Sequence, residues 1–234
     1  MIERSWLIEE VKSLDNATLR EMKRELSGLG TLRGGPEVPN LAVRIKDVVI
    51  FDNRKWFGEA NIRLDVLVIH GRSQENKLDS FYTPGTFRFG RVADGDHLPI
   101  GESGLLVFYG KPLHFMDIFI TVSRDRKDSD DLAVLLSRQL QSPNISGAIG
   151  TLLGLAVSVP HVAVVAAAVE AAAIVGNFAY QILQKVTENT IGLYRTSWLQ
   201  HRDRFGIGRH PEMDSYLVKD LSFWYEILIE ESSV

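Results

Sequence analysis

The stretch that decides the fold is Leu41–Phe51, LAVRIKDVVIF. Apolar side chains alternate with polar ones along it, as they do in a half-buried strand, where successive side chains point to opposite faces of the sheet. The stretch Asn61–His70, NIRLDVLVIH, repeats this pattern after a short interval. The alternation therefore predicts two strands of one half-buried β structure.

The chain on the C-terminal side continues the same pattern. Three more strand-like runs cover residues 80–89, 105–109 and 113–123, and glycines separate them. Several short strands at this spacing are typical of an antiparallel sandwich. An aromatic-rich run, Leu221–Ile229, is predicted to return and close the sheet.

The chain on the N-terminal side of these strands shows helical rather than alternating spacing of apolar residues. Residues 2–28 carry apolar side chains at helical spacing and predict two short amphipathic helices, whose mixed charge argues against a DNA-reading helix-turn-helix. A Gly- and Pro-rich loop follows over residues 32–40. We therefore divide the chain into an N-terminal helical segment, 1–31, and a sandwich, 32–234.

A long insertion, about residues 131–188, interrupts the sandwich before its closing strands. Asp131–Gln141 reads as a helix, and the stretch from Gln139 to Val169 contains no Asp, Glu, Lys or Arg. That stretch exceeds the about 20 apolar residues that cross a bilayer. Pro160 divides it, so we expect a hairpin of two helices, 145–158 and 161–186.

Two interpretations of this apolar hairpin stay open. It is either a helical pair buried against one face of the sandwich, or a hairpin that inserts into a membrane or becomes exposed under some condition. Its alanine, glycine and valine content weakens the drive into lipid. Glu170, in the second helix, also favours burial in protein, because a lone carboxylate at bilayer depth costs a few kcal/mol.

Composition excludes several classes of function. The net charge is −4, from 26 basic and 30 acidic residues, which argues against a general nucleic-acid binder. The absence of cysteine excludes disulfides, thiolate nucleophiles, zinc fingers and iron–sulfur sites. The N-terminus lacks the basic-then-apolar order of a secretory signal, so we expect a cytoplasmic protein, with peripheral association with a membrane as the alternative.

An acidic cluster follows the predicted strand 113–123. It consists of Asp125, Asp128, Asp130 and Asp131. Calcium needs several oxygen ligands gathered on one flexible loop. Together with a second loop, Phe51–Glu59, this cluster and the strand pattern resemble a C2 domain, over about residues 40–131 and the closing strand.

The resemblance implies a β-sandwich whose loops at one end bind calcium and phospholipid headgroups. The ligands carried over would be Asp52, Asp125, Asp128 and Asp130. This chain departs from the C2 pattern, because Asp125 and Asp128 have two residues between them rather than one. Four cations, Arg54, Lys55, Arg126 and Lys127, also stand beside the aspartates. An alternative role for Asp128 or Asp130 is to cap the following helix. C2-like sandwiches without calcium serve in protein or lipid contacts.

The segment 195–211 is the second candidate contact site, for a protein partner or a lipid headgroup. Arginines can hold phosphate or carboxylate groups by paired hydrogen bonds while aromatic rings anchor the surface. Its candidate residues are Arg195, Trp198, Arg202, Arg204, Phe205 and Arg209. The alternative is a solvated loop whose arginines pair with the nearby acids Asp203, Glu212 and Asp214.

No catalytic constellation is recognisable. The sequence lacks nucleophile-elbow, P-loop, dinucleotide and zinc-protease motifs, and its six histidines fall in separate segments. Asp94–His97 has the residue types of a metal site but also those of a turn.

We therefore predict an α+β fold: a C2-like antiparallel sandwich with N-terminal helices and an apolar helical-hairpin insertion. We expect a non-enzymatic interaction module that binds a protein partner or a membrane surface through the C2-like sandwich and its helical insertion. We expect no resident cofactor; calcium in the acidic loop is the alternative. Two alternatives are a latent membrane-damaging effector, whose hairpin a partner or protease releases, and an enzyme of unrecognised type.

Overall fold

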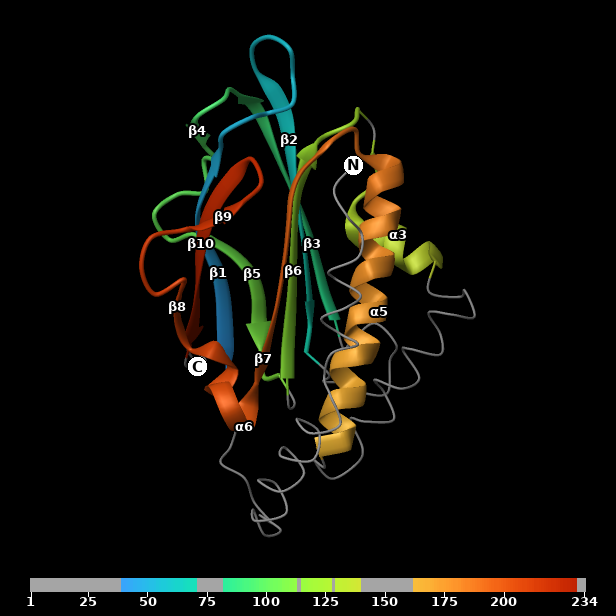
Figure 1. The fold of residues 1–234 in the computed structure, drawn as a ribbon, viewed down its shortest axis with the longest axis vertical. Coiled ribbons are helices and arrows are strands. Elements are labelled where there is room, and N and C mark those ends of the chain that lie inside the picture. Colours follow the sequence, from blue (N-terminus) through green and yellow to red (C-terminus); the bar gives the residue numbers. More distant parts are fainter. Residues whose placement is uncertain (1–38, 71–81, 113–114, 128, 140–161, 231–234) are drawn as a thin grey trace.

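The computed structural model describes residues 39–70, 82–112, 115–127, 129–139 and 162–230. The described chain forms three layers: two antiparallel sheets and a layer of helices on the outer face of one of them (Figure 1). This is the mainly β, sandwich-like architecture with a few helices that the alternating runs predict.

The first sheet, sheet A, is built on two long neighbouring strands, β1 (Leu41–Ile50) and β10 (Leu221–Ile229). They pair antiparallel along nearly their full length, from Leu41 opposite Ile229 to Ile50 opposite Leu221. The predicted closing strand is therefore confirmed. Short strands flank this pair: β4 (Asp96–His97) and β5 (Leu105–Gly110) on β1, and β8 (Gly208–His210) and β9 (Tyr216–Val218) on β10.

The second sheet, sheet B, has the order β3-β2-β6-β7, and every neighbouring pair is antiparallel. Its strands are β3 (Tyr82–Val92), β2 (Ala60–Ile69), β6 (Phe115–Arg124) and β7 (Thr190–Leu199). The first three lie in the predicted runs. Strand β7 was not predicted, because the sequence analysis assigned Arg195 and Trp198 to a polar contact segment.

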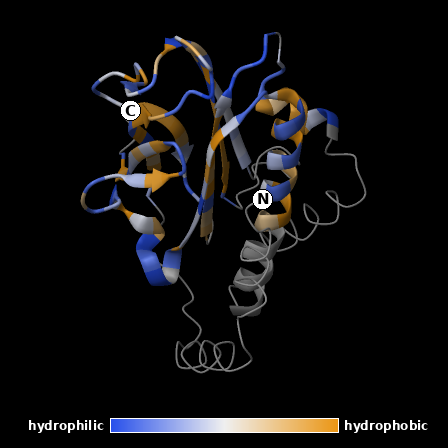
Figure 2. Cartoon of the chain, turned by 45° about the horizontal axis from the view of Figure 1, so that its top comes forward, coloured by the Kyte–Doolittle hydropathy of each residue, from blue (hydrophilic) through white to orange (hydrophobic). Residues whose placement is uncertain are grey.

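The main core lies between the two sheets. Alternate residues of β2, such as Ile62, Leu64 and Val66, point into it and are fully buried. Sheet A supplies the opposite wall, with Ile45 of β1 and Phe223 of β10. Hydrophobic residues concentrate on these strands and on the helix that covers sheet B, whereas many connecting segments are hydrophilic (Figure 2).

The insertion packs on the other face of sheet B. Its described helices are α3 (Leu132–Gln139) and α5 (Val162–Val186), which confirms the predicted helices at 131–141 and 161–186. Leu132 and Leu136 of α3 and Val175 of α5 form a second core with sheet B. A short helix, α6 (Gln200–Asp203), and a 3-10 turn, η1 (Arg204–Gly206), follow β7.

Two other predictions, the segment 1–31 and the first hairpin helix, 145–158, lie outside the described residues. Within the part of the chain that the structure describes, no helix combines the length and apolar character needed to cross a membrane.

Candidate interaction site

The loop Phe51–Glu59, which joins β1 to β2, exposes an unusual amount of aromatic surface. It projects beyond the sheets at one end of the sandwich, the upper end in Figure 1. Trp56 is 88% exposed, Phe57 is 76% exposed and Phe51 is 48% exposed. The Trp56 and Phe57 rings contact each other edge to face, with centroids 5.9 Å apart at 77°. We name this segment the tip loop.

Asn53 fixes the conformation of the tip loop from inside. Its side chain is buried, and its Nδ2 donates to the carbonyl oxygens of Gly58 and Val92, each at 2.9 Å. Its Oδ1 accepts from the backbone amide of Lys55 at 2.8 Å. An Asn side chain that replaces backbone partners in this way stabilises a tight turn. Gly58 has φ of +70°, which favours glycine at this position.

Neighbouring segments also hold the tip loop. The amide of Phe51 donates to the carbonyl oxygen of Asp220 in the β9–β10 turn, at 2.8 Å. The amide of Asn53 donates to Asp94 Oδ1 at 2.7 Å, and Arg124 Nη1 on β6 donates to the Arg54 carbonyl at 2.9 Å. The backbone of the loop is thus tied to both sheets, while Trp56 and Phe57 protrude.

The charges of the tip loop compensate one another. Arg54 forms ion pairs with Asp52 and with Asp220. Lys55 Nζ donates to the Glu59 carbonyl at 2.7 Å, and the Glu59 carboxylate lies 3.7 Å from the guanidinium of Arg91 on β3. The aromatic pair therefore stands on a base with both signs of charge interspersed.

The residues considered as calcium ligands are engaged with arginines or backbone amides. Asp52 Oδ1 accepts from the Arg54 amide at 2.7 Å, Asp125 Oδ2 accepts from Arg88 at 3.1 Å, and Asp130 pairs with Arg138. Asp128 lies outside the described residues. Among the described side chains, no group of three or more His, Asp or Glu is placed to hold a metal ion.

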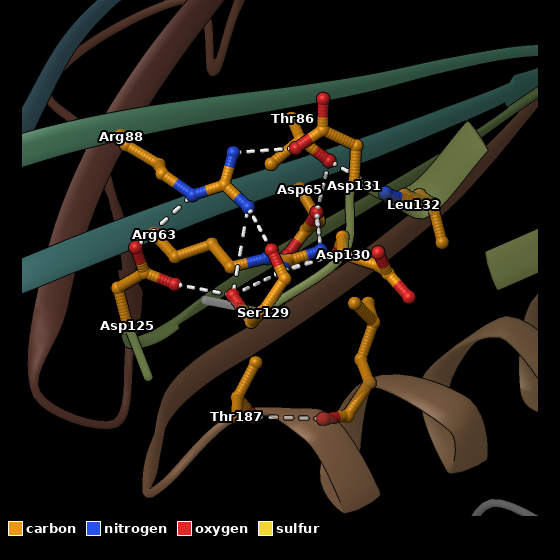
Figure 3. Close-up of polar contacts among 11 residues, drawn as sticks. Arg63, Asp65, Thr86, Arg88, Asp125, Ser129, Asp130, Asp131, Leu132 and Thr187 are labelled. Atoms are coloured by element: carbon orange, nitrogen blue, oxygen red, sulfur yellow. Dashed lines mark hydrogen bonds and ion pairs between the residues drawn. The ribbon is translucent and has the colours of Figure 1, made fainter. Parts of the chain in front are cut away.

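A network of charged side chains joins the β6–α3 loop to the helix-facing side of sheet B (Figure 3). Arg88 on β3 donates to Asp125, Asp131 and the Ser129 carbonyl. The hydrogen bond to Asp131 raises the pKa of Arg88 above its ordinary value. Thr86 accepts from the amide of Leu132, the first residue of α3, at 2.8 Å. This network positions α3, and Thr86 rather than an aspartate receives that first amide.

Arg63 and Asp65 form the buried part of the network (Figure 3). Two guanidinium nitrogens of Arg63 donate to the two carboxylate oxygens of Asp65, at 2.6 and 2.9 Å. The third nitrogen donates to Ser129 Oγ and to the Asp130 carbonyl, both at 2.8 Å. Burial raises the pKa of Asp65, and the bonds from Arg63 oppose that rise.

The predicted contact segment 195–211 is divided between interior and surface. Arg195 Nη2, on the helix-facing side of β7, donates to Asp117 Oδ2 at 2.7 Å, and Asp117 is fully buried. Burial raises the pKa of Asp117 against the opposing effect of Arg195. Trp198 Nε1 donates to the Tyr225 hydroxyl at 3.2 Å, and Phe205 is buried in the main core.

The remaining arginines of that segment have local partners or face solvent. Arg202 pairs with Asp203 at 2.8 Å, which raises the pKa of Arg202. Arg209 donates to the carbonyl oxygens of Pro211, Glu212 and Asp214, and its guanidinium lies 4.5 Å from the ring centre of Trp224. Arg204 is exposed. The structure therefore does not gather the six predicted residues on one open surface.

A small cavity lies between α5 and sheet B. Its volume is about 10 Å³, close to the space that one water occupies. Asp65 and Thr121 line it together with apolar residues such as Leu132 and Leu183, and no histidine does. This cavity offers no room for a substrate.

Sequence reasoning selected the tip loop for its aspartate and missed its aromatic side chains. The signal was the adjacent pair Trp56-Phe57 within a polar turn. No protein-family model matches the chain, and no curated protein matches it in sequence.

Proposed function

We propose that this chain is a non-enzymatic interaction module of C2-like architecture, and that the tip loop is its contact element. The observation that carries this proposal is the exposure of Trp56 and Phe57 on a loop that hydrogen bonds hold in place. Tryptophan is enriched among the residues that dominate binding energy at interfaces, and a fixed backbone lowers the entropy cost of binding.

Burial of the two rings would contribute part of the binding energy. Full burial of a large apolar side chain contributes about 1.5–3 kcal/mol. Association itself costs roughly 4–15 kcal/mol, so buried area does not convert directly into affinity. The pair is therefore proposed as the anchor of the interface, and surrounding contacts must supply the remaining binding energy.

The described carboxylates have internal partners. Those of Asp65, Asp117 and Asp125 are engaged by arginines, and the cavity that Asp65 lines has a volume of about 10 Å³. The two alternatives stay predictions: the membrane-damaging effector depends partly on residues 145–158, outside the described chain, and the enzyme on a site not recognised in the sequence.

Photo-crosslinking tests the contact role of the tip loop. Benzoylphenylalanine replaces Lys55, which is exposed beside the aromatic pair, and the chain is irradiated in the cells that produce it. We expect a discrete adduct whose yield falls at least about tenfold in a Trp56→Ala/Phe57→Ala background, because interface anchors contribute about 2 kcal/mol or more.

The control places benzoylphenylalanine at Tyr109, which is 46% exposed and lies near the end of sheet A remote from the tip loop, opposite Ala42. This position is expected to give none of that adduct. An equal adduct yield with and without the two aromatic rings would show that the tip loop is not the contact element.

A further inference from the structure

We infer that the tip loop docks into an apolar pocket of a partner protein, with Trp56 and Phe57 entering as one shaped knob. This inference rests on the proposed function, because it names the partner class for the same loop. Three features of the tip loop support it: the geometry of the ring pair, the hydrogen bonds beneath it and the charge around it.

The ring pair has a defined shape. The Trp56 and Phe57 rings contact each other at 77°, so they present one compact edge-to-face unit rather than two independent side chains. A fluid bilayer accepts apolar side chains in many arrangements, whereas a protein pocket accepts one. A preorganised backbone lowers the entropy cost of binding, and a complementary protein pocket would gain specific contacts from this edge-to-face arrangement.

The hydrogen bonds beneath the pair fix the backbone from which both rings project. The buried amide of Asn53 bridges Gly58, on the far side of the ring pair, and Val92 on β3. Arg124 holds the Arg54 carbonyl, just before the ring pair. Both ends of the protruding segment are therefore anchored to strands, which lowers the entropy lost when a partner binds.

The charge around the pair does not favour an anionic membrane. Within the tip loop, Asp52 and Glu59 balance Arg54 and Lys55. Arg54 is paired with Asp52 and Asp220, and Arg91 lies beside Glu59. Attraction to acidic lipids needs a surplus of Lys and Arg near the surface, about 1 kcal/mol for each. The balanced charges around Trp56 and Phe57 suit a protein pocket whose edges are neutral or carry both signs of charge.

A swap variant separates shape from hydrophobicity. In Trp56→Phe/Phe57→Trp the composition and total aromatic area of the loop are unchanged, while the shape of the knob changes. In the Lys55 crosslinking assay, we expect the swap to lower the adduct yield by about tenfold, because a mismatched anchor loses most of its pocket contacts. We expect protease to degrade the crosslinked partner, because the inferred partner is a protein.

A second variant changes geometry without touching either ring. Asn53→Ala removes the bonds to Gly58 and Val92, and we expect it to lower the adduct yield severalfold while Trp56 and Phe57 remain. The unfolding midpoint of each variant shows whether the sandwich stays folded. The swap leaves every hydrogen bond of the loop in place, so it tests the inference even if Asn53→Ala folds poorly.

Vesicle co-sedimentation supplies the opposing outcome. The probes are vesicles of phosphatidylcholine alone and of phosphatidylcholine mixed with phosphatidylserine, each with and without calcium. Sedimentation that requires the two rings and survives the swap would overturn the inference in favour of a bilayer contact, and would leave the proposed function intact. An adduct yield unaffected by the swap would overturn it as well. If Trp56→Ala/Phe57→Ala lowers neither the adduct yield nor the vesicle sedimentation, the proposed function itself is refuted.

Discussion

At the residue scale, the ion pair of Arg63 and Asp65 shows how sheet B tolerates charge beneath its helices. The two residues are two positions apart on β2, so both side chains point to the helix-facing side. Both side chains are fully buried. A buried pair is tolerated only when its remaining hydrogen-bonding groups are satisfied, and here Ser129 and Asp130 meet the remaining donors of Arg63.

Removing one partner of this pair is expected to destabilise the fold strongly. Arg63→Leu leaves the Asp65 carboxylate buried without its cation, and we expect a loss of about 3–5 kcal/mol in the free energy of unfolding by urea. The double variant Arg63→Leu/Asp65→Leu is expected to recover most of that loss.

A matched control for this prediction is Arg44→Leu, which breaks the more exposed pair with Glu230 on sheet A. Exposed pairs contribute up to about 1 kcal/mol, so this change is expected to be small. If the single and double variants at β2 are equally destabilised, the buried charge is not the cause.

At the element scale, α5 approaches sheet B closely because its contact face carries small side chains. Ala172, Gly176 and Ala179 are buried on that face. The ring of Phe119 on β6 occupies the space that a side chain at Gly176 would fill, and the Arg195 guanidinium lies 5.1 Å from the centre of the same ring. Gly176 thus leaves room for the Phe119 ring, which also has a cation–π contact with Arg195.

This contact reverses the usual effect of an alanine in a helix. Replacing a helical glycine with alanine normally stabilises by about 0.5–1 kcal/mol. At Gly176 the new Cβ would overlap the Phe119 ring, so we expect Gly176→Ala to destabilise by about 1–3 kcal/mol. Hydrogen exchange is expected to quicken in α5 more than in sheet A. Asn177→Ala, on the exposed face, is the control, and equal effects of both would contradict the packing argument.

At the scale of the whole molecule, aromatic residues connect the two sheets. The Tyr194 hydroxyl on β7 lies 3.4 Å from the Tyr225 hydroxyl on β10, and Trp198 on β7 donates to the same Tyr225 oxygen. The Tyr194 ring also contacts Phe223 edge to face. Burial raises the pKa of Tyr225 to about 12 and raises that of Tyr194 as well.

These shifts predict a loss of stability in alkali. Both tyrosines have folded-state pKa values above the unfolded value of about 10, so their contribution is complete below that pH and falls as the pH rises through the folded values. For Tyr225 the loss reaches about 2 kcal/mol near pH 12. Urea unfolding from pH 9 to 12 should give a shallower decline for Tyr194→Phe than for the natural chain. Tyr109→Phe is the control, and identical declines in all three proteins would contradict this explanation.

The alternating runs predicted most of both sheets, but not β7 or the short strands β4, β8 and β9. In β1 one face is buried in the core and the other carries half-buried residues such as Arg44 and Lys46, and the alternation of residue types reflects that difference. In β7 one face meets sheet A through Tyr194 and Trp198, and the other meets the helix layer through Arg195 and Leu199. Polar and apolar side chains occur on both faces of β7, since Thr196 lies between Tyr194 and Trp198 on one face and Ser197 lies between Arg195 and Leu199 on the other. No alternation therefore marks it as a strand.

The candidate site was also predicted only in part from the sequence. Sequence singled out the tip loop for a metal because its residue types suggested ligands, and it singled out Arg195 and Arg209 because their charge suggested an external anion. Their partners, Asp117 for Arg195 and the backbone carbonyls of the 211–214 turn for Arg209, are found within the protein. Residue type alone does not reveal whether a charge has an internal partner.

Local periodicity alone predicts the antiparallel strands, the return of Leu221–Ile229 and the helical character of 131–141 and 161–186. The folded chain was needed to show which charges pair across distant segments and which aromatic side chains remain exposed, because burial depends on what packs against a residue from elsewhere in the chain. Trp56 and Trp198 are the same residue type, yet one protrudes from the tip loop and the other bonds to Tyr225.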